Sequence, residues 1–306
     1  MNKKFYLFSF VLLIVGVILG LFLGRMLFYV DETSYILKAT LKEMGIRYNL
    51  STAFLRQIFP DEIVYIDNGK VTFESYDDSL KRHEYDWRNL VITPQRYDYI
   101  VNNKSIVKHG VDVSRFQEEI DWSKVAASDI SFAMLRIGYR GYSEGILYVD
   151  SYFHDNAINA SANNIALGGY FFSQAITVAE AEEEARFVLS LIADHDITYP
   201  IVFDMEEIAN TKTRSDHLSK EEITQITLAF CKVIKDAGYT PMIYGNSHWF
   251  FAKLDLKALE DIPKWYAQYS SEPYYPYAFD IWQYTSSGKV DGIKGNVDLN
   301  IAFKTY

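Results

Sequence analysis

Two carboxylates separated by one residue, Asp204 and Glu206, form a pair that could transfer protons. They follow the apolar run 200–203, and in an extended chain the side chains of residues i and i+2 point to the same face. Two carboxyl groups held close together raise the proton affinity of one of them, which can then stay protonated at neutral pH. We therefore assign the role of proton donor to Glu206 and that of ionised partner to Asp204.

A proton donor beside an ionised carboxylate is the combination that cleaves glycosidic bonds. Asp112 and Asp298 also lie at the ends of predicted strands, so we expect four acids to share one cleft. A divalent-metal site built from the same acids is less favoured, because a retained metal more often recruits histidine or a regular acidic loop. The six histidines form no His-x-x-x-His pair and Cys231 is the only cysteine, so we predict neither metal nor cofactor.

The elements that would position these acids begin near residue 108, where short apolar runs start to alternate with amphipathic stretches. Capping boxes at Thr177/Glu180 and Ser219/Glu222 predict two helix starts. The stretches between the last three strands carry no helical pattern. We therefore expect an α/β fold, a β/α barrel without its final helices, whose site lies at the carboxyl ends of the strands. The predicted strands are 111–113, 132–137, 166–172, 200–204, 241–244, 264–268, 279–284 and 297–299, with helices after the second to the fifth.

Aromatic residues near the predicted strand ends could stack on sugar faces. Glu207 should point away from the acidic pair and be structural, and the acidic run 182–184 should be a solvated helix face. The predicted substrate-binding residues are Tyr139, Tyr170, Trp265, Tyr269, Gln283 and Tyr284.

Residues 5–24 carry no charge, and a helix of that length reaches about 30 Å, the thickness of bilayer hydrocarbon. A cleaved signal peptide would have a shorter apolar region that ends in a small-x-small cleavage site, and no convincing cleavage site follows this stretch. Lys3 and Lys4 precede the stretch, and this charge bias predicts a cytoplasmic N-terminus. We expect a single-pass signal-anchor in the cell membrane with an extracellular catalytic domain.

Residues 31–107 are expected to form a stalk and a small β-rich, membrane-proximal module, with hairpins around 67–70 and 102–105. The simplest role for this region is that of a spacer. The predicted domains are thus 1–30 (cytoplasmic tail and anchor), 31–107 (stalk and module) and 108–306 (barrel). The formal net charge of −10 argues against nucleic acid as a partner, because its capture needs a basic face.

The barrel region resembles glycoside hydrolase family 25, the cellosyl-type lysozymes or N-acetylmuramidases, over about residues 108–306. The resemblance rests on the segments 110–114 (GVDVS), 120–122 (IDW), 168–172 (GGYFF), 204–206 (DME), 265–269 (WYAQY), 282–284 (WQY) and 297–300 (VDLN), which occur in order and at sensible spacing.

The resemblance implies a TIM-like (β/α)5(β)3 barrel that hydrolyses the β-1,4 bond between N-acetylmuramic acid and N-acetylglucosamine in peptidoglycan. It also implies Glu206 as general acid/base, Asp204 as the residue that assists the substrate's own N-acetyl group, and Asp112 and Asp298 as the other cleft acids. Such a mechanism retains configuration without a covalent enzyme intermediate.

The chain departs from the family pattern at Phe116 and Phe171, where the family commonly has histidine. Neither position is expected to act as an acid or base, so the departures concern subsites rather than catalysis. Two other functions stay open. One is an inactive membrane-tethered protein that binds or scaffolds peptidoglycan, against which the presence of all four acids speaks. The other is a hydrolase of a different N-acetylglucosamine polymer, such as chitin.

Overall fold

The computed structural model describes residues 14–18, 31–48, 50–67, 69–208 and 210–306. The chain divides into two compact units, residues 1–58 and 59–306. The first contains the helices α2 (Asp31–Arg47) and α3 (Thr52–Ile58), and Leu55 of α3 is buried where Gly45 leaves room for its side chain. Among the described residues, no helix has the length and apolar character needed to cross a membrane. The predicted span at 5–24 lies outside the described residues, apart from 14–18.

Eight strands of the second unit close into a barrel. In spatial order they are β6 (Lys108–Val113), β7 (Phe132–Arg140), β9 (Ala166–Phe172), β10 (Ile197–Asp204), β11 (Pro241–Gly245), β12 (Lys264–Ala267), β13 (Ile281–Gly288) and β14 (Val297–Ala302), and β6 pairs with both β7 and β14. All neighbours are parallel except β14, which runs antiparallel to β13 and β6. A short strand, β8 (Leu147–Val149), pairs only with β7.

The barrel interior changes from apolar to polar along the strands. Phe132 and Met134 of β7 lie in a buried apolar cluster with Val202 of β10 and Ile281 of β13. Gly110 on β6 makes this packing possible, because a Cβ there would lie 2.3 Å from the Phe132 ring. Since side chains two residues apart share a face, the inward positions that follow on these strands are polar. They are Asp112, Arg136, Asp204 and Gln283.

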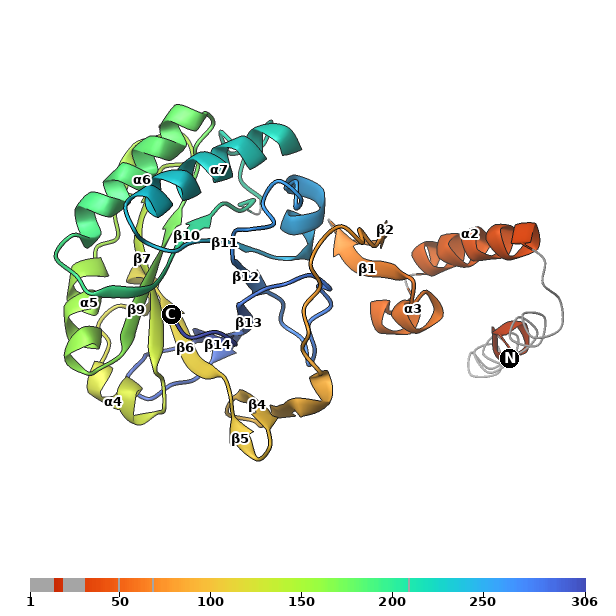
Figure 1. Ribbon diagram of the computed structural model, residues 1–306, viewed down its shortest axis with the longest axis horizontal. Coiled ribbons are helices and arrows are strands. Elements are labelled where there is room, and N and C mark those ends of the chain that lie inside the picture. The colour runs from red at the N-terminus through yellow and green to blue at the C-terminus, as the bar shows by residue number, and fades with distance from the viewer. Residues whose placement is uncertain (1–13, 19–30, 49, 68, 209) are drawn as a thin grey trace. The chain divides into compact units, whose positions relative to one another are not determined.

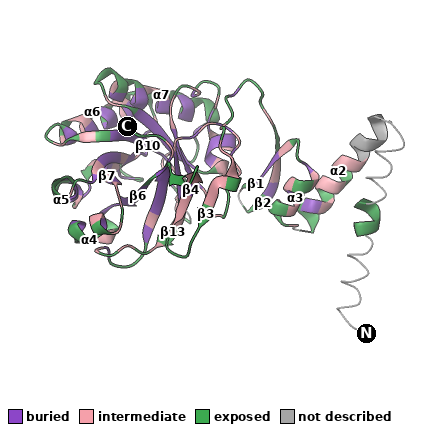
Figure 2. Cartoon of the chain, turned by 60° about the horizontal axis from the view of Figure 1, so that its bottom comes forward, coloured by how far each residue is buried: buried purple, intermediate pink, exposed green. Residues whose placement is uncertain are grey.

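Helices cover the outside of the first strands (Figure 1). They are α4 (Trp122–Ala127), α5 (Phe153–Ala162), α6 (Val178–Ile192) and α7 (Lys220–Asp236), and a five-residue π-helix, η3 (Trp249–Lys253), follows β11. Ser219 and Glu222 form the predicted capping box of α7. Figure 2 shows that burial is concentrated in the strands and in the inner sides of these helices. The apolar stripes of α6 and α7 therefore form the layer that supports β9 and β10.

Residues 76–107, here called the cover segment, pack on the strands that have no helices. Within residues 254–306, all of which the structure describes, strands follow one another without a helix. The Tyr85 ring stacks on Phe303 at 4.0 Å and its hydroxyl donates to the Phe279 carbonyl at 2.6 Å. Tyr97 stacks on Tyr284 of β13 at 4.4 Å.

The cover segment holds η1 (Trp87–Asn89) and the strands β3 (Leu90–Ile92), β4 (Tyr97–Val101) and β5 (Lys104–Ser105). Before it, β1 (Glu62–Asp67) and β2 (Lys70–Ser75) form a hairpin. Tyr97 of β4 packs on Trp282 and Tyr284 of β13. Aromatic side chains of this segment thus replace the missing helices as the apolar cover of β13 and β14.

Most of the predicted elements are present. All eight predicted strands occur, and the two predicted hairpins are β1–β2 and β4–β5, the second turning at Asn102 and Asn103, which both have positive φ. Two expectations were wrong. The stretch after the fifth strand forms the short π-helix η3 rather than a full helix, and a helix not predicted, α4, follows the first strand. The predicted domain boundaries stay a prediction.

The cover segment should contribute strongly to stability. Removing residues 59–107 would expose Trp282, Tyr284 and Phe303 to water, and each buried aromatic contributes about 2 kcal/mol or more. We expect residues 108–306 alone to melt at least roughly 10 °C below residues 59–306. Thermal unfolding of both fragments, followed by circular dichroism, measures the difference. Equal melting temperatures would show that the segment is merely a spacer.

Candidate active site

Asp112, at the end of β6, is a buried carboxylate held by two amides. Its Oδ2 accepts hydrogen bonds from Gln283 Nε2 at 2.9 Å and from Asn300 Nδ2 at 2.8 Å. Burial, and then the nearby charge of Asp298, raise the pKa of Asp112 well above its usual value, and the two amide donors oppose this rise. Both donors act on one oxygen, so this carboxyl group is fixed in orientation.

The two amides are themselves fixed by aromatic side chains. The hydroxyls of Tyr244 and Tyr269 donate to Gln283 Oε1 at 2.9 and 3.0 Å. The Trp265 indole N–H donates to Asn300 Oδ1 at 2.8 Å. Because each amide oxygen is occupied by a donor, each amide nitrogen must face Asp112. Residues from β11, β12, β13 and β14 thus set the position of one carboxylate on β6.

Asp204 ends β10, and Glu206 follows it at the same end of the barrel. The two carboxyl groups interact directly, and this interaction raises the pKa of Asp204 and lowers that of Glu206. Burial and the charges of Glu206 and Asp112 raise the pKa of Asp204 well above its usual value. Burial, and the charge of Asp298 in addition, raise the pKa of Glu206 to about 7. The pair therefore holds a proton at neutral pH, as like charges at short range require.

Asp298, the fourth acid of the group, lies on β14, the strand that runs antiparallel to its neighbours. It stands beside Asp112 in the antiparallel register of β14 and β6. Burial raises its pKa to about 6, and a hydrogen bond from its own backbone N–H opposes the rise. Because β14 is reversed, its first residues lie at the end of the barrel where the parallel strands finish.

Arg136 brings positive charge to this acidic group. It lies on β7, two residues after Met134, and its Nε contacts Asp150 Oδ2 at 2.7 Å. Its charge lowers the pKa of Asp204, against the larger effects that raise it. The guanidinium lies 5.0 Å from the Phe116 ring centroid and 5.6 Å from that of Tyr139. Its Nη2 is buried without a hydrogen-bond partner, which leaves a donor for a group that enters the site.

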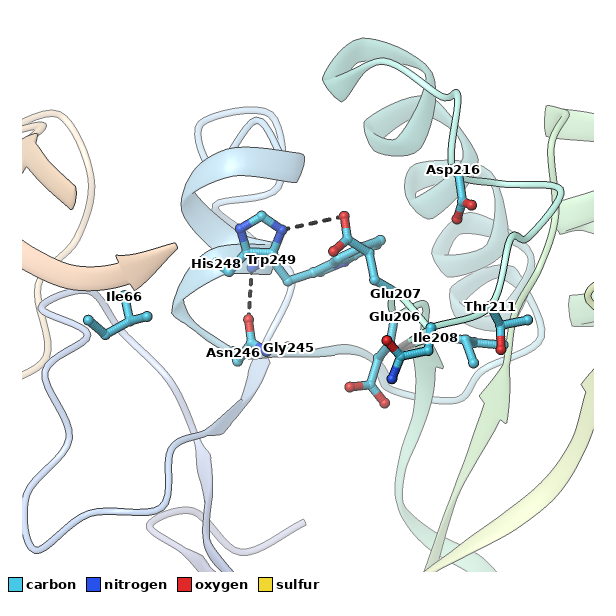
Figure 3. Close-up of a pocket in the computed structure, with 11 residues that line it drawn as sticks. Ile66, Glu206, Glu207, Ile208, Thr211, Asp216, Gly245, Asn246, His248 and Trp249 are labelled. Atoms are coloured by element: carbon cyan, nitrogen blue, oxygen red, sulfur yellow. Dashed lines mark hydrogen bonds and ion pairs between the residues drawn. The ribbon is translucent and has the colours of Figure 1, made fainter. Parts of the chain in front are cut away.

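A cleft of about 580 Å³ opens beside the acidic pair (Figure 3). Glu206 lines it, whereas Asp204 is only 4% exposed and lies behind. Glu207 also lines the cleft, and its carboxylate is paired with Lys253 at 2.7 Å and faces His248 at 3.6 Å. Of the two carboxyl groups in the pair, Glu206 is the one placed to meet a ligand in this cleft.

The structure brings most of the predicted site residues together. Asp112, Asp298, Trp265, Tyr269 and Gln283 share one network with the acidic pair. The Tyr170 ring lies 6.0 Å from that of Trp265, and its pKa is raised first by burial and then by the charge of Asp112.

Of the other two predicted substrate-binding residues, Tyr139 lies at the edge of this network and Tyr284 lies away from it. Tyr139 stacks on Tyr148 of β8 at 5.1 Å, beside Arg136. Tyr284 stacks on Tyr97 of the cover segment, on the other side of β13 from Gln283. At the two departures from the family pattern, Phe116 is 71% exposed and Phe171 is fully buried.

The site also contains residues that the sequence did not single out. Arg136 and Tyr244 lie in none of the segments that resemble the family, and Asn300 ends the segment 297–300 without a predicted role; each lies an even number of residues from another inward position on its strand. That alternation was the available signal. One acidic residue was misplaced. Glu184, expected on a solvated face, is buried and pairs with Arg140 Nε at 2.7 Å. Within the described residues, no three His, Cys, Asp or Glu side chains are arranged to hold a metal ion.

The family model for glycosyl hydrolases family 25 matches residues 111–293, more than half of the chain. The chain belongs to glycosyl hydrolase family 25. The match contains Asp112, Asp204 and Glu206, and Asp298 lies just beyond it. The protein is therefore a glycosidase of the lysozyme type.

Known proteins resemble the same region. The protein YegX of Escherichia coli K12 is 31% identical over 199 residues, which are 63% of this chain and 68% of YegX. Lysozyme M1 of Streptomyces globisporus is 28% identical over 201 residues, 62% of this chain and 66% of that enzyme. The structure of the autolysin LytC from Streptococcus pneumoniae, solved with a synthetic peptidoglycan ligand, matches with a TM-score of 0.57 at 21% identity, covering 79% of this chain and 57% of LytC. This last likeness concerns the fold.

The raised pKa of Glu206 predicts a pH-dependent stability. The folded protein keeps this proton up to a pKa of about 7, against an ordinary value of 4.5, so the unfolding free energy falls as pH rises between these values. Glu206→Gln removes that dependence. We expect the variant to melt above the native protein at about pH 8, with the difference shrinking at about pH 5. The exposed Glu119, changed to Gln, is the control. A difference that is the same at both pH values would contradict the raised pKa.

Proposed function

We propose that this glycosidase cuts the glycan strands of peptidoglycan at the β-1,4 bond between N-acetylmuramic acid and N-acetylglucosamine. The observation that carries the proposal is the Glu206 carboxyl, which lines an open cleft, has a pKa raised to about 7 and interacts with the carboxyl group of the buried Asp204. The names of the related lysozymes and the peptidoglycan ligand of LytC support the choice of substrate.

In the first step Glu206 gives its proton to the glycosidic oxygen as the bond from that oxygen to the anomeric carbon breaks. The oxygen of the substrate's own acetamido group forms the new bond to that carbon from the opposite face. Asp204 accepts a hydrogen bond from the acetamido N–H and stabilises the positive charge of the resulting ring. Glu206 then takes a proton from the water that opens the ring, which regenerates the acid and retains configuration.

The surroundings of the other two acids suit them to supporting roles. Asp112 is bound by two amide donors and faces inward, so it is not free to attack the substrate. Its charge, and that of Asp298, instead raise the proton affinity of Asp204 and Glu206 respectively. Arg136 opposes this effect at Asp204. The balance leaves one proton on the pair at neutral pH, and the first step uses the form in which Glu206 carries it.

We further propose that residues 5–24 anchor the protein in the cell membrane with the catalytic barrel outside. The support is the uncharged stretch of twenty residues and the lysines before it. Peptidoglycan lies outside the membrane, so this orientation would place the enzyme on the same side as its substrate.

The products of peptidoglycan digestion test the reaction. We expect the native protein to release fragments whose new reducing ends are N-acetylmuramic acid, seen by mass spectrometry after borohydride reduction. Glu206→Gln keeps the shape but lacks the proton donor, so kcat should fall at least about 100-fold. New N-acetylglucosamine ends would show that the assigned bond is wrong. Binding without cleavage would favour the scaffolding function, and faster hydrolysis of chitin would favour the other polymer.

Cell fractionation tests the anchor. We expect the full-length protein in the membrane fraction, resistant to extraction by high salt and released by detergent, because insertion of an apolar helix does not depend on ionic contacts. A variant with two central leucines of the stretch, Leu12 and Leu13, changed to arginine should leave that fraction. Recovery of the native protein in the soluble fraction would overturn the proposal.

A further inference from the structure

One wall of the cleft comes from outside the part of the chain that matches the family. The cleft is lined by the loop after β10 and by the residues after β11, and it is also lined by Ile66 of β1. Ile66 precedes the matched residues 111–293. Figure 3 shows it across the cleft from Glu206, with His248 and Trp249 between them.

The hairpin β1–β2 is held in place by contacts on both sides of Ile66. The carboxylate of Asp67 pairs with the His248 imidazole. The Tyr65 ring packs on Phe251 of η3 at 5.0 Å. Tyr65 is buried, and burial raises the pKa of its hydroxyl to about 12. The position of Ile66 is therefore set by its two neighbours in the strand rather than by contacts of its own side chain.

The same contacts connect the hairpin to the acidic pair. His248 faces Asp67 on one side and Glu207 on the other, and Glu207 is also paired with Lys253. Glu207 is the neighbour of Glu206 in the chain. A continuous series of contacts between polar side chains thus runs from the hairpin to the loop that carries the proton donor.

Ile66 is 48% exposed although it lies between a buried residue and an ion-paired one. A ligand that covers this half-exposed apolar side chain at the rim of the cleft would remove apolar surface from water, which favours binding. The remaining lining defines the chemistry of that ligand. The amides and hydroxyls suit hydroxyl and acetamido groups, the apolar side chains suit the face of a pyranose ring, and the carboxylate of Asp216 disfavours an anion. The lining residues that bear on this chemistry are Asp216, Asn210, Thr211, Asn246, Ile208 and Trp249.

We propose that the β1–β2 hairpin forms a glycan subsite in which Ile66 packs on a neutral N-acetylated sugar next to the bond that Glu206 cleaves. The inference rests on the proposed function and adds to it a specificity-determining element from outside the family segment. The amide, hydroxyl and apolar lining favours N-acetylglucosamine, and the Asp216 carboxylate disfavours a sugar that carries a carboxylate of its own.

Steady-state kinetics of the full-length protein on peptide-free glycan strands of two lengths test the subsite. Ile66→Ser should raise KM roughly fivefold on the long strands and leave kcat unchanged, because it removes binding surface but no reacting group. The effect should be smaller on strands too short to reach the subsite. The matched control is Ile92→Ser on β3, an isoleucine of nearly equal exposure, 47%, that does not line the cleft.

The outcomes separate the two proposals. If the native protein cuts the strands but Ile66→Ser and Ile92→Ser have the same KM, the subsite is wrong and the proposed function stands. If the native protein cuts nothing, calorimetric titration of the same strands decides: weaker binding by Ile66→Ser alone keeps the subsite, and equal binding or none overturns it. Should Ile66→Ser lower the melting temperature, Ile66→Thr keeps the β-branched shape and is compared in its place.

Discussion

Each strand of a closed barrel turns alternate side chains inward, and this alternation determines where polar groups can stand in the molecule. Near the closed end the inward positions hold Phe132, Met134 and Val202, which pack without polar atoms. One step further along the same strands, the inward side chains of Arg136 and Asp204 meet each other's charge. Along each strand, the inward side chains thus change from apolar ones in the packed core to polar ones at the site. The register of the strands is consequently the condition on which the site depends.

Burying the acids at the site lowers the free energy of unfolding, although the same burial prepares them for the reaction. Burial is the largest cause of the raised pKa at Asp112, Asp204, Glu206 and Asp298 alike, and repulsion from neighbouring acids adds to it at the first three. The protein offsets this cost where it can do so without losing the shared proton. Two amides bind Asp112, and the charge of Arg136 lowers the pKa of Asp204. For Glu206, it is the interaction with Asp204 that lowers the pKa.

The sequence predicted the barrel strands well because their apolar runs have the lengths and spacing that parallel strands need. It predicted that Asp298 lies near the other acids, but it did not predict the direction of the strand that carries this residue. The residue stands at the beginning of a reversed strand, and no pattern within that strand reveals its direction. Arg136 and Glu184 were missed because their burial depends on partners far along the chain, Asp150 and Arg140. The tertiary contacts of Tyr97 and Ile66 were equally invisible to local spacing.

The proton affinity of Glu206 links the cleft walls to the chemistry. Since burial is the main cause of its raised pKa, anything that excludes water from the cleft raises the pKa further. A sugar ring that covers Ile66 and fills the space beside Glu206 would do so at the moment when the proton is needed. The acid would then keep its proton until the glycosidic oxygen accepts it, and this effect comes from the sugar that fills the cleft rather than from the Ile66 side chain.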